Sequence, residues 1–284
     1  WYAKLKDGVA EVLLGLRESG SGLLRADSSI WERHWEHGQR RHFTFSNVAA
    51  VLGLRAMATL ATMAGQPADA TRYAAAATSL SEAIADHLVD PATEILVSDL
   101  ESLSAGPTGF IDAAPVEAFT HEVLPALSPT AASTLAAYDA HLRLPSGGYK
   151  RNDDGDTYDE REWLIIDLRI AAAHFRRGEA AAGQALLDWV VGQSRQNFDL
   201  LPELFDQTSG DFAGEVPMVG FGAGAYLLTL FDRPAAAPGK DAGMDGARDA
   251  GGVIDGGAGE RTGDASGIDA GVGDGPTGEG ARPG

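Results

Sequence analysis

The stretch that decides the fold runs from residue 43 to residue 65 and reads FTFSNVAAVLGLRAMATLATMAG. Its large apolar residues recur at every third or fourth position, which is the spacing of one face of an α-helix. Gly65 closes the pattern, as glycine often does just after the last turn of a helix. The stretch therefore predicts one long amphipathic helix, whose apolar positions are Val48, Val51, Leu52, Met57, Leu60 and Met63.

The same periodicity continues on both sides of this helix through residue 233. No strand-like alternation of any length interrupts it, so the sequence predicts an all-α domain over residues 1–233. We expect about eight helices, which cover approximately residues 2–18, 43–65, 68–89, 111–124, 128–142, 161–178, 179–196 and 216–231. Long polar loops inside a compact domain are usually functional, and here they cover residues 19–41, 91–110, 145–160 and 197–214.

The composition changes at residue 234. From there to residue 284 the chain contains no aromatic residue and consists mostly of glycine, alanine and aspartate. Such a segment cannot bury enough apolar surface to offset the entropy lost on ordering. We therefore expect residues 234–284 to form a disordered acidic tail.

The net charge excludes some classes of partner. It is -19 at pH 7, whereas nucleic acids and anionic membranes are bound by basic patches. No apolar run is expected to reach the length of a transmembrane helix. The chain has no cysteine, which excludes disulfides, thiolate zinc sites and cysteine nucleophiles. We expect neither a nucleic-acid nor a membrane partner, and the sequence leaves the cellular compartment open.

Three of the long loops carry polar and aromatic motifs. They read DSSIWERHWEHGQRRHFTFSN at 27–47, GGYKRNDDGDTYDEREW at 147–163 and NFDLLPELFDQTSGDFAGEVP at 197–217. In order and spacing they resemble the catalytic domain of glycoside hydrolase family 15, which contains glucoamylases, glucodextranases and bacterial trehalases. The resemblance covers about residues 1–232, and the matching positions are Ile30, Trp31, Glu32, Arg41, His42, Phe43, Thr44, Ser46, Gly147, Gly148, Arg151, Glu162, Trp163, Leu201, Pro202 and Glu203.

This resemblance implies a six-hairpin (α/α)6 toroid of twelve helices. Only about eight helices are expected here, and the four without a counterpart are the first four of the family. Those helices also supply an Arg–Asp pair that grips the terminal sugar, and no segment of this chain matches that pair. The implied fold is therefore an incomplete toroid, with the N-terminal part of the same domain expected elsewhere.

The resemblance implies inverting hydrolysis of α-linked glucose oligosaccharides or polysaccharides by an exo-acting α-glucosidase, without a cofactor. Glu32 aligns with the general acid and Glu203 with the general base, and inversion requires one carboxyl group of each kind. The indole of Trp31 beside Glu32 would exclude water and raise the pKa of the acid. The local sequence alone favours a solvated loop acid for Glu32, and Glu203 is also readable as a first-turn acid that complements a helix dipole.

The substrate cleft is expected to include six further residues. The planar guanidinium of Arg151 suits vicinal hydroxyl groups, although Arg151 is also readable as a surface ion-pair partner. Aromatic faces stack on sugar rings, although Trp163 is also readable as a core residue. Trp189 reads as a core residue and Trp35 stays undecided. The expected substrate-binding residues are Trp31, His42, Arg151, Glu162, Trp163 and Phe221.

One departure from the family supports an alternative function. Residues 220–227, GFGAGAYL, replace an aromatic-Ser-His-Ala sequence, so Gly222 and Ala223 remove polar groups from the cleft. This favours a carbohydrate-binding or regulatory relative that has lost catalysis. An unrelated α-solenoid would need a repeat of fixed period, which the helices lack.

No metal site is expected. The acids of NDDGDTYDE at 152–160 are out of register for an EF-hand calcium loop. The histidines at positions 34, 37 and 42 form no helical i, i+4 pair, and neighbouring arginines oppose a cation.

Overall fold

The computed structural model describes residues 1–31, 40–105, 111–153, 155, 158–206 and 218–234. By compactness the chain divides into two units, Trp1–Ala236 and Ala237–Gly284. The second unit lies outside the described residues, and so does the predicted disordered tail apart from Pro234. Glu32 and its neighbours through residue 39 also lie outside them. The fold described below is therefore that of the first unit.

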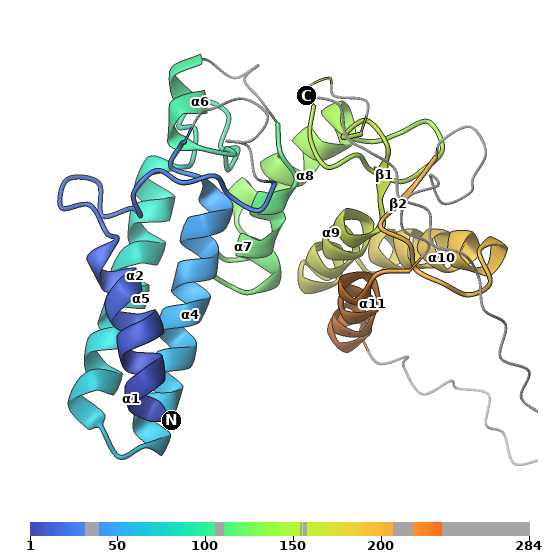
Figure 1. The fold of residues 1–284 in the computed structure, drawn as a ribbon. Helices are drawn as coiled ribbons and strands as arrows, with labels where there is room; N and C mark the ends of the chain where they lie inside the picture. The colour runs from blue at the N-terminus through green and yellow to red at the C-terminus, as the bar shows by residue number, and fades with distance from the viewer. Residues whose placement is uncertain (32–39, 106–110, 154, 156–157, 207–217, 235–284) are drawn as a thin grey trace, which may run out of the picture. The chain divides into compact units, whose positions relative to one another are not determined.

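The N-terminal part consists of helices packed side by side (Figure 1). Tyr2 and Lys6 of the first helical segment both bond the carboxylate of Asp69 on α5, at 3.0 and 2.7 Å. Gly65 makes the turn between α4 and α5 with a φ of +70°, a conformation that glycine adopts without strain. The bounds are α1 Tyr2–Leu5, a π-helical turn Lys6–Ala10, α2 Glu11–Gly15, α4 Thr44–Met63 and α5 Pro67–His87.

Helix α4 corrects one expectation from the sequence. It is long and apolar enough to cross a membrane by length and composition, although no such segment was expected. A single helix of this kind is weak evidence for a membrane, because core helices share the same composition. In this chain α4 packs along α5, and its buried Asn47 accepts a hydrogen bond from the backbone N–H of Leu24 at 2.8 Å. It is a core helix of the first unit.

The later helices form two further packed groups. Ser128 begins α8 by accepting a hydrogen bond from the N–H of Ala131, and α9 packs against both α10 and α11 (Figure 1). The bounds are α6 Leu100–Ala105, a 3₁₀ turn Ala114–Val116, α7 Glu117–Thr120, α8 Pro129–His141, α9 Leu164–Arg176, α10 Ala180–Gln196 and α11 Gly220–Asp232.

Two predicted element boundaries are wrong. The helix expected over residues 111–124 is confined to a 3₁₀ turn and the single turn of α7, because Asp112 instead forms an extended bridge with Asn152. A short helix, α6, also forms inside the expected loop 91–110.

The structure adds one short strand pair to the expected helices. Strand β1, Glu162–Trp163, pairs antiparallel with β2, Leu204–Phe205. Glu162 lies opposite Phe205, and Trp163 lies opposite Leu204. This short pairing joins the second and third motif loops. It leaves the described residues predominantly helical, as the all-α expectation requires.

Candidate active site

Trp31 is fixed in the interior. Its side chain is only 7% exposed, and its indole N–H donates to Oδ1 of Asp112 at 2.8 Å. The same oxygen accepts a hydrogen bond from the backbone N–H of Ala114 at 2.9 Å. The Trp31 ring lies 5.6 Å from that of Trp163 between ring centres. The adjacent Glu32 lies outside the described residues, so its predicted role as the acid stays a prediction.

Arg151 lies at the centre of a group of aromatic rings. Its guanidinium carbon is 4.3 Å from the ring centre of Trp163, 4.8 Å from that of Trp31 and 5.3 Å from that of Tyr158. The side chain is nearly buried and forms an ion pair with the buried carboxylate of Asp159. A buried cation is costly unless it is paired, and here Asp159 and the ring faces compensate the charge. We call Arg151, Trp31, Tyr158, Asp159 and Trp163 the Arg151 cluster.

One backbone hydrogen bond holds Arg151 in place, and one side-chain hydrogen bond holds Asp159. The carbonyl of Arg151 accepts a hydrogen bond from the N–H of Ala113 at 2.9 Å. Nδ2 of Asn152 donates to Oδ2 of Asp159 at 3.0 Å. Arg151 is therefore a buried ion-pair partner, which differs from the surface ion pair considered as an alternative.

Glu203 adjoins the Arg151 cluster through Tyr158. The phenol hydroxyl of Tyr158 donates to Oε2 of Glu203 at 2.7 Å. Glu203 is half-buried and immediately precedes β2, whose pairing with β1 brings it to the end of the second motif loop. The structure thus brings together Trp31, Arg151, Trp163 and Glu203 among the predicted site residues.

Trp163 has a free donor in this region. Its ring is almost completely buried, and its indole N–H has no hydrogen-bond partner among the described residues. Buried donors are normally paired, so an unpaired one needs a reason. A ligand hydroxyl group is one acceptor that this N–H could serve.

The side chain of Glu162 points away from the Arg151 cluster. Neighbouring residues in a strand face opposite sides, so Glu162 is directed away from the face of Trp163. Its carboxylate, 1% exposed, accepts a hydrogen bond from the indole N–H of Trp189 at 2.8 Å. Trp189, expected in the core, is half-buried and lines a hollow of about 220 Å³ with Gly147 and Tyr149. The structure therefore does not bring Glu162 to the Arg151 cluster.

The carboxyl group of Glu162 also interacts electrostatically with that of the buried Asp167. Burial raises the pKa of Glu162 and raises that of Asp167 well above its usual range. Two adjacent carboxyl groups in a dry site cannot both ionise, so one proton is retained by the pair. Oδ1 of Asp167 accepts a hydrogen bond from the backbone N–H of Tyr149 at 2.8 Å.

The remaining two predicted residues lie apart from the cluster. Nδ1 of His42 is 2.7 Å from Glu101 and its Nε2 is 3.3 Å from Glu18. Burial lowers the pKa of His42, but its hydrogen bonds to Glu101 and Glu18 outweigh this and raise it. Phe221 lies on α11 and is 46% exposed. Neither contacts the Arg151 cluster among the described residues.

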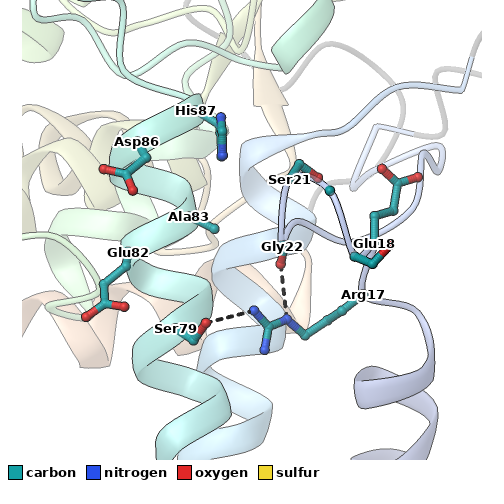
Figure 2. A pocket seen from close by; sticks show the side chains of 11 residues that line it. Arg17, Glu18, Ser21, Gly22, Ser79, Glu82, Ala83, Asp86 and His87 are labelled. Carbon is teal, nitrogen blue, oxygen red and sulfur yellow. Dashed lines mark hydrogen bonds between the residues drawn. The ribbon is translucent and has the colours of Figure 1, made fainter.

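A larger hollow of about 530 Å³ lies between residues 17–22 and the last turns of α5 (Figure 2). Arg17 crosses it, donating from Nε to the carbonyl of Gly22 at 3.0 Å and from Nη2 to Ser79 at 3.1 Å. The carboxylates of Glu18 and Asp86 line the hollow. Glu18 also contacts His42. Among the predicted site residues that the structure describes, none lines this hollow, so the Arg151 cluster with Glu203 is the candidate site.

Sequence reasoning missed Tyr158, Asp159 and Asp112. Tyr158 and Asp159 lie within the second motif loop, in the acidic segment that was weighed as a calcium loop. Their partners are distant in sequence: Tyr158 bonds a residue 45 positions away, and Trp31 bonds Asp112 across 81 positions. Only the pairing of β1 with β2 would have revealed the first of these contacts.

No family model matches the sequence, and no curated protein matches it. Solved structures do resemble the fold. A bacterial glucoamylase complexed with acarbose has a TM-score of 0.62 at 15% identity, over 81% of this chain and 38% of that one. A wild-type glycosidase has a TM-score of 0.55 at 18% identity, over 72% of this chain and 56% of that one.

A glycosidase variant in complex with glucose aligns at 17% identity with a TM-score of 0.55, over 70% of this chain and 53% of that one. This chain thus spans about half the length of these glycosidases and less of the glucoamylase. The expectation of an all-α fold of the glucoamylase toroid type is confirmed. At these identities the likeness concerns the fold alone.

Proposed function

We propose that this chain belongs to a glycoside hydrolase that acts on α-linked glucose oligosaccharides or polysaccharides with inversion, as an exo-acting α-glucosidase. The observation that carries the proposal is Glu203, a half-buried carboxylate bonded by Tyr158 beside the Arg151 cluster, in a fold of the glucoamylase type. The resemblance of the motifs to glycoside hydrolase family 15 supports the same assignment.

Glu203 is proposed as the general base. An inverting base must be ionised and must hold a water molecule against the sugar face opposite the leaving group. A carboxylate that receives one hydrogen bond on Oε2 keeps Oε1 free for that water. The sugar that undergoes cleavage would bind beside Glu203, at the edge of the Arg151 cluster.

Glu32 is proposed as the general acid. It follows Trp31, whose indole is buried and held by Asp112. A carboxyl group beside a buried indole would keep its proton at higher pH, because a dry environment disfavours the charged form. The acid would protonate the leaving glycosidic oxygen.

Full activity is proposed for the complete domain. The chain spans about half of the solved glycosidases, and the sugar-gripping Arg–Asp pair implied by the resemblance has no counterpart in it. The N-terminal part of the domain would supply that pair. The substrate would then be bound by that Arg–Asp pair together with the site in this chain.

The test is a comparison of three glutamate variants at full natural length. Glu32→Gln and Glu203→Gln keep size but cannot transfer a proton. Each is expected to lower kcat by about 10²–10⁴-fold while leaving oligosaccharide affinity near that of the unchanged protein. Glu122→Gln, an exposed glutamate in a surface ion pair with Arg176, is the matched control and should be fully active. Full activity of Glu203→Gln would contradict the proposal.

A second candidate is a carbohydrate-binding relative without catalysis. Gly222 favours it, because a Cβ atom added there would lie 3.4 Å from Leu201, two residues before Glu203, and the family carries polar side chains in this segment. This candidate predicts measurable oligosaccharide binding by calorimetry and no turnover in the unchanged protein. Turnover that depends on Glu203 would exclude it.

A further inference from the structure

Tyr158 joins Glu203 to the Arg151 cluster. It donates a hydrogen bond to Oε2 of Glu203 at 2.7 Å, and its ring lies under the guanidinium of Arg151 at 5.3 Å. We propose that Tyr158 is a positioning residue for the general base, fixing one oxygen of its carboxylate. This inference rests on the proposed function of Glu203.

The ring of Tyr158 is held from two directions. The ring of Trp163 meets it edge-on, with centres 5.3 Å apart and planes inclined by 82°. Arg151 contacts its face, and Arg151 is itself anchored by the buried carboxylate of Asp159. Trp163 is fixed in turn by its place in β1 opposite Leu204. The hydroxyl group therefore has a defined direction before any ligand arrives.

The same strand pair sets the distance to Glu203. Tyr158 lies four residues before the start of β1, and Glu203 lies directly before β2. Because the strands are antiparallel, the chain enters β2 where it leaves β1. Glu203 therefore lies at the Trp163 end of the strand pair, and Tyr158, which precedes β1, reaches it alongside the ring of Trp163.

The chemistry favours a donor of this kind. A hydrogen bond to the charged form of a carboxyl group favours that form. The positive charge of Arg151 near the ring makes the phenol a stronger donor, because it stabilises electron density on the oxygen. With Oε2 occupied, the proton from water is directed to Oε1. A carboxyl group that rotates freely would not present Oε1 to the water, and a protonated one would not accept the proton.

The first experiment replaces the hydroxyl group alone. Tyr158→Phe keeps the ring and its contacts with Arg151 and Trp163. We expect kcat to fall about 10- to 100-fold with KM changed little, since the lost bond acts through the base. The acidic limb of the kcat/KM profile should move to higher pH by roughly one unit.

A matched control is available at the other end of the chain. Tyr2 also donates from its hydroxyl to a carboxylate, that of Asp69, at 3.0 Å. Tyr2→Phe removes the same group and the same kind of bond far along the sequence from Glu203. It should leave kcat and the pH profile unchanged.

A second substitution keeps the test decisive if Tyr158→Phe disturbs folding. Site-specific 3-fluorotyrosine at position 158 keeps ring and hydroxyl but makes the phenol more acidic and a stronger donor. The acidic limb should then move to lower pH. An acidic limb that stays in place with 3-fluorotyrosine, or with a folded Tyr158→Phe, would overturn the inference.

The double variant separates this inference from the proposed function. If Tyr158 acts through Glu203, Tyr158→Phe combined with Glu203→Gln should be no slower than Glu203→Gln alone. A further tenfold loss in the double variant would overturn the positioning role while leaving Glu203 as the base. Unchanged activity in Glu203→Gln would overturn the proposed function instead.

Discussion

Gly148 touches a carboxylate that cannot easily move, and this makes Gly148→Ala an informative substitution. A Cβ atom added at Gly148 would lie 2.3 Å from Cδ and 2.6 Å from Cγ and Oε1 of Glu162. No contact of this kind is tolerated, so Glu162 has to shift. Glu162 is buried and accepts a hydrogen bond from Trp189, so a shift breaks this hydrogen bond.

The expected loss of stability follows from these two effects. Overpacking in a filled interior costs about 1–3 kcal/mol, and loss of a hydrogen bond to a buried charged group costs about 1–3 kcal/mol. Their sum is about 2–6 kcal/mol of the free energy of unfolding. At about 2–4 °C per kcal/mol for a domain of this size, the melting temperature should fall by about 4–24 °C.

The assay is thermal unfolding followed by circular dichroism. Gly192→Ala is the matched control, because it lies in α10 with no atom within 4 Å of the added Cβ. In a helix this change should raise stability by up to about 1 kcal/mol. In a Glu162→Ala background, Gly148→Ala should cost far less, because the clashing atoms are gone. Equal melting temperatures of Gly148→Ala and Gly192→Ala would refute the reasoning.

Three further predictions concern the acid pair, the apolar surface and the tail. The raised pKa values of Glu162 and Asp167 mean that the folded state binds a proton more tightly than the unfolded state does. This proton binding stabilises the folded state most below the unfolded pKa values, and the stabilisation falls as pH rises toward neutrality. Asp167→Asn, which stays neutral, should flatten that fall in urea titrations across pH 4–8; an unchanged slope would contradict the shared proton. Residues 1–284 expressed alone should self-associate, because α11 exposes Leu227, Leu228 and Phe231; a monomeric product that melts cooperatively in ultracentrifugation and calorimetry would contradict this. Deleting residues 234–284 should leave the melting temperature and oligosaccharide binding unchanged, and a drop of several degrees would show that the tail packs on the domain.

The sequence predicted the long helices well because their signals are local. The three-to-four spacing and Gly65 predict α4, which spans Thr44–Met63, and the Ser-Pro start predicts α8, which begins at Pro129. The segment over residues 111–124 has the same composition, yet a bridge from Asp112 to Asn152 competes with the helix. That competitor lies 40 positions away, so no local pattern reveals it.

The site was predictable only where the motifs were recognisable. Arg151, Trp163 and Glu203 were selected by resemblance, and the structure brings them together around Tyr158. Glu162 was selected for the same reason, but strand alternation turns it toward Trp189. A two-residue strand is too short to show alternation in sequence, so its facing could not be predicted.

The proposed function requires hydrolysis by inversion with Glu203 as the base. Proton NMR of the anomeric signals, recorded during the first minutes of reaction with an α-linked glucose oligosaccharide, measures both properties for the full-length protein and for Glu203→Gln. We expect β-glucose to appear first with the unchanged protein, and Glu203→Gln to release it at least about 10²-fold more slowly. Initial release of α-glucose would contradict inversion, and release at an unchanged rate by Glu203→Gln would contradict the role of Glu203.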